Sequence, residues 1–420
     1  MFHNRLMTFF AVVFLGTITS TLAFGAPKPV LSDEMLTART KLIYSNQDEY
    51  KDKVYGAWYG KLIGLILGQP TEGWTKQQIE EKARRINAYP VTYYFPSSFD
   101  SSLKGFLAGN FDGSPANDDS DLMLTSLLAL RENGIGLTSR NIAEAWVKYV
   151  RGACTAEGIA LANFKKGIWP PESAAIDNPY DEWIGAQMRG EIWGMIAPGM
   201  PKVAARYAAL DASISHNRNG IYGEQFISAA LSVAMVEKSP EKVIRTALTA
   251  IPDDCVYASA IKDILKWHKE NLDWQSAWEL LDKKWGVFED GSRTRKFKDD
   301  RFNTDKDLYQ WPDQKWVVAD VNGAACTLAL LYGEGDFSSS ICIAAMCGYD
   351  NDCNSGTVGA ILGAMHGEKA IPDRWKSPIR DIYHSGLCLT ERDLKISKLA
   401  EETARYGQQV MEKQNIGKHD

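Results

Sequence analysis

Apolar residues recur every three to four positions along most of the chain, the period of helices that bury one face. The clearest such segments are 122–132, 139–151, 201–210, 224–237, 240–250, 256–270, 320–332, 338–347 and 355–366. Thr390 and Asp393 have capping-box-like spacing and predict a terminal helix over 390–413. Only 90–95 has the pattern of a strand. With no linker or composition break after residue 35, the chain is expected to form one all-α domain.

Two of the apolar segments carry glycine at every fourth position. Each glycine inside a helix costs about 1 kcal/mol relative to alanine. Loops would tolerate these residues, but the apolar residues between the glycines argue against loops. We therefore predict two helices whose backbones approach each other closely. The rows are Gly56, Gly60, Gly64 and Gly68, and Gly359, Gly363 and Gly367.

Four tryptophans, Trp267, Trp274, Trp278 and Trp285, follow one another at intervals of 7, 4 and 7, as on one face of a helix. Such a row could form a carbohydrate platform. A packed core stripe is the preferred interpretation, because burial itself demands this spacing.

The first residues have the layout of a secretory signal peptide. Arg5 precedes an apolar stretch, and small residues follow before Pro27. A membrane anchor is the alternative, but the stretch is short and contains several Thr and Ser residues. We predict a signal peptide over 1–25, a lead-in over 26–45 and a helical domain over 46–415, in a secreted or periplasmic protein.

The charge of the chain limits its binding partners, and its cysteine content limits its disulfide and zinc chemistry. The 420 residues carry 47 basic and 53 acidic side chains, a net charge of −6 without a basic block. This argues against nucleic-acid and anionic-membrane partners. Seven cysteines, an odd number without zinc-type spacing, leave at least one unpaired. Cys326, Cys342 and Cys347 have apolar neighbours and are expected to be buried as small hydrophobic residues.

Two acidic clusters stand where helices are expected to begin, at 117–121 (NDDSD) and 350–355 (DNDCNS). Each alone could simply cap its helix. Together they offer hard oxygen ligands for Mg²⁺, Mn²⁺ or Ca²⁺. If they converge, two carboxylates 4 Å apart repel by about 4 kcal/mol, so a cation or a proton must intervene. An EF-hand at 350–361 is excluded, because Ser355 and Ile361 stand at positions six and twelve of the loop.

The order of these motifs resembles the ADP-ribosylglycohydrolase family. The segment 56–74 (GAWYGKLIGLILGQPTEGW) resembles the family's opening glycine-rich helix and the Glu that follows it. NDDSDL at 117–122 is similar to its Thr-Asp-Asp-Thr-Glu-Met element, and 348–367 to its Gly-Gly-Asp-Thr-Asp-Thr stretch. The segments 184–199 and 212–230 match in order and character. The resemblance spans about residues 50 to 380.

The resemblance implies an orthogonal multi-helix domain and a binuclear Mg²⁺ or Mn²⁺ centre. Cys353 stands where the family has Thr and is a soft ligand that Mg²⁺ disfavours. Leu65 replaces the usual Asp of the first helix. The number of ions, one or two, therefore stays open, with Asn354 or Ser355 as further ligands. The implied ligands are Asn117, Asp118, Asp119, Asp350, Asp352 and Cys353.

The implied activity is metal-dependent hydrolysis of an N- or O-glycosidic bond in an ADP-ribosyl, nucleoside or furanoside-type substrate. Glu72, Asp119 and Asp350 are the catalytic candidates, with Glu72 gating the site or transferring a proton. A metal-dependent phosphohydrolase and a non-catalytic crystallin-like protein are the alternatives, and the oligomeric state stays open. The substrate-binding candidates are Trp193, His216, Tyr222 and Asn354.

Overall fold

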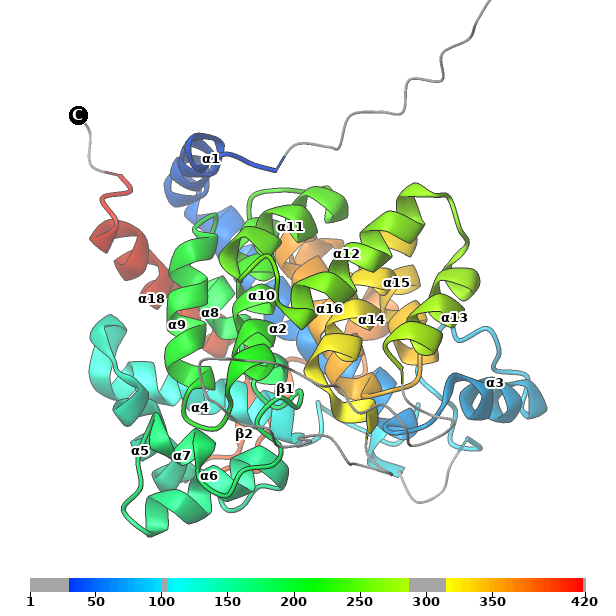
Figure 1. Cartoon of the computed structure of the whole chain (residues 1–420), viewed down its shortest axis with the longest axis horizontal. Helices are drawn as coiled ribbons and strands as arrows, with labels where there is room; N and C mark the ends of the chain where they lie inside the picture. Colours follow the sequence, from blue (N-terminus) through cyan, green and yellow to red (C-terminus); the bar gives the residue numbers. More distant parts are fainter. Residues whose placement is uncertain (1–29, 100–103, 287–314, 418–420) are drawn as a thin grey trace, which may run out of the picture.

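The computed structural model describes residues 30–99, 104–286 and 315–417 (Figure 1). Within these ranges it contains eighteen α-helices and one two-stranded sheet, which confirms the all-α prediction. The predicted signal peptide lies outside the described residues. No helix within these ranges is long and apolar enough to cross a membrane.

The first nine helices are α1 Asp33–Ser45, α2 Gln47–Gly68, α3 Lys76–Arg85, α4 Asp118–Asn133, α5 Ser139–Tyr149, α6 Thr155–Lys165, α7 Glu172–Ala175, α8 Glu191–Met195 and α9 Pro201–Ala212. The other nine are α10 Arg218–Ala234, α11 Pro240–Ala247, α12 Val256–Lys269, α13 Trp274–Lys284, α14 Ala319–Tyr332, α15 Phe337–Met346, α16 Asn351–His366, α17 Asp373–Lys376 and α18 Ile396–Lys413. The strands β1 (Ile382–His384) and β2 (Asp393–Lys395) form an antiparallel pair.

Helices α2 and α16 lie side by side in the middle of the molecule, where α10, α14, α15 and α18 cover them (Figure 1). Their two glycine rows face each other. A Cβ atom added at Gly60 would overlap the backbone of Gly359, and one at Gly363 would overlap the backbone of Gly56. The predicted close approach is therefore confirmed, and it offsets the low helix propensity of glycine because the two backbones pack directly.

The strand predicted over 90–95 is wrong. This segment has no partner strand, and its rings pack instead in an aromatic cluster in which Tyr93 and Tyr94 both contact Trp375. Strand propensity largely reflects burial of branched and aromatic side chains, which this cluster also provides. The two real strands are only three residues long and lie near the C-terminus.

Several helix boundaries also differ from the predictions. Helices α4 and α16 begin at Asp118 and Asn351, four residues earlier than expected, because polar side chains in their first turns are buried. The acidic clusters are thus part of the helices. Helix α18 begins at Ile396 instead of Thr390, since the backbone of 393–395 pairs with β1.

The four tryptophans do not share one helix. Trp267 lies in α12, whereas Trp274 and Trp278 lie in α13. Trp267 and Trp278 are buried in the core, as the preferred interpretation expected. The seven cysteines are all free, and Cys326, Cys342 and Cys347 are buried, which confirms both predictions about them.

Candidate active site

The two acidic clusters meet in one cavity of about 340 Å³. Asp118 and Asp119 come from the first turn of α4, and Asp350 and Asp352 from the start of α16. Glu72 reaches the cavity from the turn that follows α2. The structure thus brings together, as predicted, carboxylates that are about 230 positions apart in the sequence.

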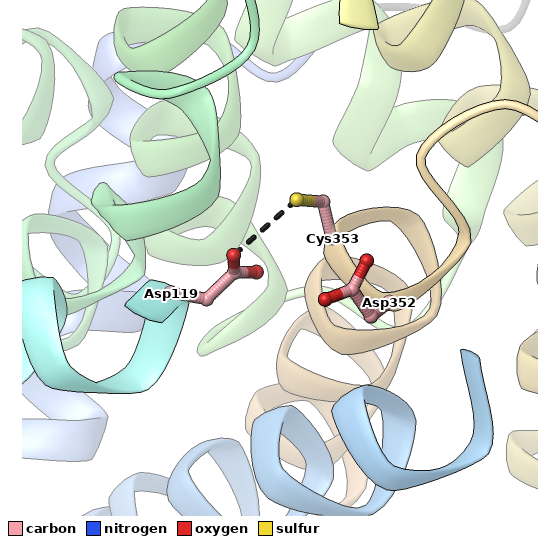
Figure 2. Close-up of side chains that lie close together, drawn as sticks. All are labelled: Asp119, Asp352 and Cys353. Carbon is pink, nitrogen blue, oxygen red and sulfur yellow. Dashed lines mark hydrogen bonds between the residues drawn. The ribbon is translucent and has the colours of Figure 1, made fainter. Parts of the chain in front are cut away.

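Within the cavity the side chains form two groups that share Asp352. In the first group, ligand atoms of Asp119, Asp352 and Cys353 all lie within 4.8 Å of one another. Figure 2 shows Asp119 facing the other two across the gap between α4 and α16. Glu72 and Asp350 form the second group with Asp352, within the same limit. Either group has enough ligands to begin a metal site.

Asp350 and Asp352 have the chemistry of ligands for a divalent cation. Both are buried, and one carboxylate oxygen of each (Oδ1) has no hydrogen-bond partner among the described residues. A buried carboxylate without partners is costly. Hard, unpartnered carboxylate oxygens are what Mg²⁺, Mn²⁺ or Ca²⁺ would satisfy, so the donor set fits a divalent cation.

Repulsion between neighbouring carboxylates and their burial also raise the pKa values of the cluster. The charge of the neighbouring Asp352 raises the pKa of Glu72 to about 8. Burial, followed by the charge of Asp352, raises the pKa of Asp118 to about 6. Burial also raises the pKa of Asp350 well above its usual range. Without a compensating cation, the carboxylates therefore hold protons more tightly than usual.

Asp119 differs, because its charge is already paired. Its Oδ2 accepts a hydrogen bond from Lys61 Nζ at 3.1 Å, and its Oδ1 accepts one from the Cys353 thiol at 3.3 Å. Lys61 lies on α2 and is completely buried. Lys61 was not among the site residues predicted from the sequence. Its signal was the single lysine between Gly56 and Gly68, in the apolar, glycine-striped part of α2.

Asn117, a predicted metal ligand, is the N-cap of α4. Its Oδ1 accepts the backbone N–H of Asp119 at 2.9 Å, and its Nδ2 donates to Asp352 Oδ2 at 3.0 Å. The residue thus supports Asp352 through its amide nitrogen, while its oxygen faces its own helix. This arrangement does not favour Asn117 as a metal ligand.

The four substrate-binding candidates are not among the residues that line the cavity. Trp193 is buried in the core, where its Nε1 donates to Asp211. His216 is buried beside Ser215, which bonds its Nδ1 at 2.8 Å. Asn354 is buried and donates to Asn322, and Tyr222 is partly buried against the core. Direct substrate contact by these residues stays a prediction that their positions do not favour.

Asp121, the last residue of the acidic cluster at 117–121, also lines the cavity but was not among the predicted site residues. Asp121 accepts hydrogen bonds from Tyr383, Ser385 and the backbone N–H of Gly386, and so ties the 383–387 segment to α4. Glu157 pairs with the buried Arg189 at 3.0 Å. The remaining wall includes Leu122, Val150, Arg151, Trp183, Trp316 and Leu387.

The model of the family described as ADP-ribosylglycohydrolase matches residues 46–412. The chain belongs to the ADP-ribosylglycohydrolase family. Membership makes it a hydrolase of the glycosylase type and confirms the resemblance drawn from the motifs. The family is typically dependent on a divalent metal, in keeping with the acidic groups of the cavity.

Among solved structures, an "ADP-ribosylglycohydrolase-related protein complex" matches at 18% identity with a TM-score of 0.49. The match covers 86% of this chain and 99% of that chain. A search of curated proteins gives no match.

Proposed function

We propose that this ADP-ribosylglycohydrolase family member hydrolyses an N- or O-glycosidic bond with the help of a divalent cation, Mg²⁺ in the first place, with Mn²⁺ or Ca²⁺ as substitutes. The supporting observation is the pair of buried carboxylates, Asp350 and Asp352, which line a cavity large enough for a sugar and each keep one oxygen (Oδ1) without a hydrogen-bond partner among the described residues. These two side chains would hold the cation.

The reaction forms a bond between a water oxygen and the anomeric carbon and breaks the bond from that carbon to the leaving group, through an oxocarbenium-like transition state. When bound, the cation supplies orientation of sugar hydroxyls and a lowered pKa of coordinated water. One proton must leave the water and one must reach the leaving group. We assign proton transfer to Glu72, because it is the exposed member of its carboxylate group.

The lining of the cavity favours an uncharged glycoside. Arg151 is the one basic side chain among the described residues that line it, against several carboxylates. A nucleoside or furanoside therefore fits better than a substrate that must place a pyrophosphate near the carboxylates. The apolar rings of Trp183 and Trp316 offer surfaces on which a sugar or base can pack.

The charges of the cavity argue against a phosphohydrolase, and the unpartnered carboxylate oxygens argue against a non-catalytic protein. A phosphohydrolase needs cations that cradle the phosphate, and this wall offers only Arg151. A non-catalytic relative has no need of Asp350 and Asp352, whose unpartnered oxygens destabilise the fold unless a cation satisfies them.

Export is part of the proposal and depends on the signal-peptide pattern of residues 1–25. We expect the mature protein to begin between residues 24 and 27. N-terminal sequencing of the secreted or periplasmic protein tests this, and an intact Met1 overturns it.

A screen of nucleosides, furanosides, ADP-ribosyl compounds and phosphate esters, with and without Mg²⁺, Mn²⁺ or Ca²⁺, tests the activity. We expect metal-dependent release of a sugar, its loss in Asp350→Asn and its retention in Asp48→Asn, which changes an exposed carboxylate in the first turn of α2. Equal activity of wild type and Asp350→Asn overturns the proposal, as does release of phosphate without cleavage of any glycoside.

A further inference from the structure

The ammonium group of Lys61 makes three hydrogen bonds inside the protein. It donates to Asp119 Oδ2 at 3.1 Å, to Glu191 Oε1 at 2.9 Å and to the carbonyl oxygen of Met188 at 2.6 Å. An ammonium group has three protons, so each is used. The side chain is completely buried, and Asp119 and Glu191 are 1% and 0% exposed. This positive charge is therefore fixed against Asp119, one of the residues that line the cavity.

The two carboxylate groups differ in what they still need. Both oxygens of Asp119 are engaged, one by Lys61 and the other by the Cys353 thiol. In the other group, Asp350 and Asp352 each keep one oxygen (Oδ1) for which the described part of the chain offers no hydrogen-bond partner. The group that still needs a compensating positive charge is therefore the one formed by Glu72, Asp350 and Asp352.

We propose that the Lys61 ammonium takes the place of a second divalent cation at Asp119, so that the site binds a single divalent ion beside Asp350 and Asp352. This inference rests on the proposed function only for the presence of the metal. A divalent ion on Asp119 would compete with Lys61 for the carboxylate and would lie beside a like charge. It would also meet the sulfur of Cys353, a soft ligand that Mg²⁺ and Mn²⁺ disfavour.

In this arrangement Lys61 neutralises the negative charge of Asp119 at any metal concentration. Asp119 then acts as a positioning residue, which anchors the start of α4 to α2 and α8 through Lys61 and Glu191. Only the half nearer to Glu72 depends on exchangeable metal.

The first test is the stoichiometry of the full chain with MnCl₂, measured by calorimetry and by electron paramagnetic resonance. We expect one ion per chain and the spectrum of an isolated Mn²⁺. Two ions per chain, or a spin-coupled pair, overturns the inference. Binding of no ion at all refutes the proposed metal dependence, and with it this inference, which separates the two kinds of failure.

The second test removes the ammonium. Lys61→Met keeps an unbranched chain that is shorter by the ammonium nitrogen and leaves Asp119 and Glu191 without a cation, so we expect a second Mn²⁺ to bind. The matched control is Lys53→Met, another buried lysine of α2, whose ammonium bonds the carbonyl oxygen of Met365 at 2.8 Å. The control should still bind one ion. A folded Lys61→Met protein that binds one ion overturns the role of Lys61.

Should Lys61→Met not fold, Asp119→Asn decides. If Asp119 is paired with Lys61 instead of a metal, Asp119→Asn keeps one Mn²⁺ with a Kd changed less than about threefold. Asp350→Asn, by contrast, loses the ion. Loss of Mn²⁺ binding in a folded Asp119→Asn protein shows that Asp119 is a metal ligand and overturns the inference.

Discussion

The two ends of the α2–α16 pair differ in how well their groups are satisfied. Along the glycine rows, backbone packs on backbone with no room for a Cβ atom. The same close approach continues to Gly68, which faces the backbone of Asn351. Directly beside it stand Asp350 and Asp352, with unpartnered oxygens. Direct backbone packing of α2 on α16 thus holds the carboxylates together against their mutual repulsion, an arrangement that a divalent cation would stabilise.

Filling the glycine interface should give the largest effect. In Gly363→Ala, even one methyl group would overlap the backbone of Gly56, which cannot move without separating the helices. We expect a loss of about 3 kcal/mol or more in the free energy of unfolding, measured by urea denaturation. Gly136→Ala is the control, because a Cβ atom there meets nothing within 4 Å. Equal stability of the two variants would show that the glycine rows are not in tight contact.

At the acidic end, metal should stabilise the fold and Asp350 should be required for this. A ligand that binds only the native state at a hundred times its Kd stabilises it by about 2.7 kcal/mol. We expect Mg²⁺ or Mn²⁺ to raise the melting temperature of wild type, and Asp350→Asn to remove most of the rise. An unchanged wild-type melting curve would contradict the metal site.

Asp121 is an acidic cavity residue that differs from Asp350 and Asp352, because both of its carboxylate oxygens have hydrogen-bond partners. It accepts hydrogen bonds from Tyr383 at 2.5 Å, from Ser385 at 2.7 Å and from the backbone N–H of Gly386 at 2.9 Å. Asp121→Asn should cost about 2 kcal/mol of stability, typical of lost hydrogen bonds to a charged group. The stabilisation by metal should stay the same, measured as the difference between melting curves with and without Mg²⁺. A smaller difference would place Asp121 in the metal site.

The smallest effect is expected from Cys353→Thr, which restores the residue type of the family motif. The hydroxyl replaces a soft ligand, but Lys61 still pairs with Asp119. We therefore expect a Kd for Mn²⁺ within about threefold of wild type and no second ion, measured by calorimetry. A second ion in this variant would show that the thiol, and not Lys61, sets the stoichiometry.

Much of the fold could be predicted from local pattern. The helical period marked most helices, since a buried face repeats with the helix itself. The first turns of α4 and α16 were not predicted to be helical, because their buried residues are polar and lack that period. The segment 90–95 was misread because aromatic burial and strand pairing favour the same residue types.

The sequence by itself determined the all-α class, the glycine rows that demand a close helix contact, and the acidic clusters that identify the family. Only the tertiary structure decided which charges meet. The pairing of Lys61 with Asp119, 58 positions away, depends on where the fold places the start of α4 relative to α2. Asp119 is paired, whereas Oδ1 of Asp350 has no hydrogen-bond partner within the described ranges, and this difference likewise appears only once both residues are buried. Helical period reports burial along a single element, whereas charge compensation is a property of side chains that separate elements bring within about 3 Å.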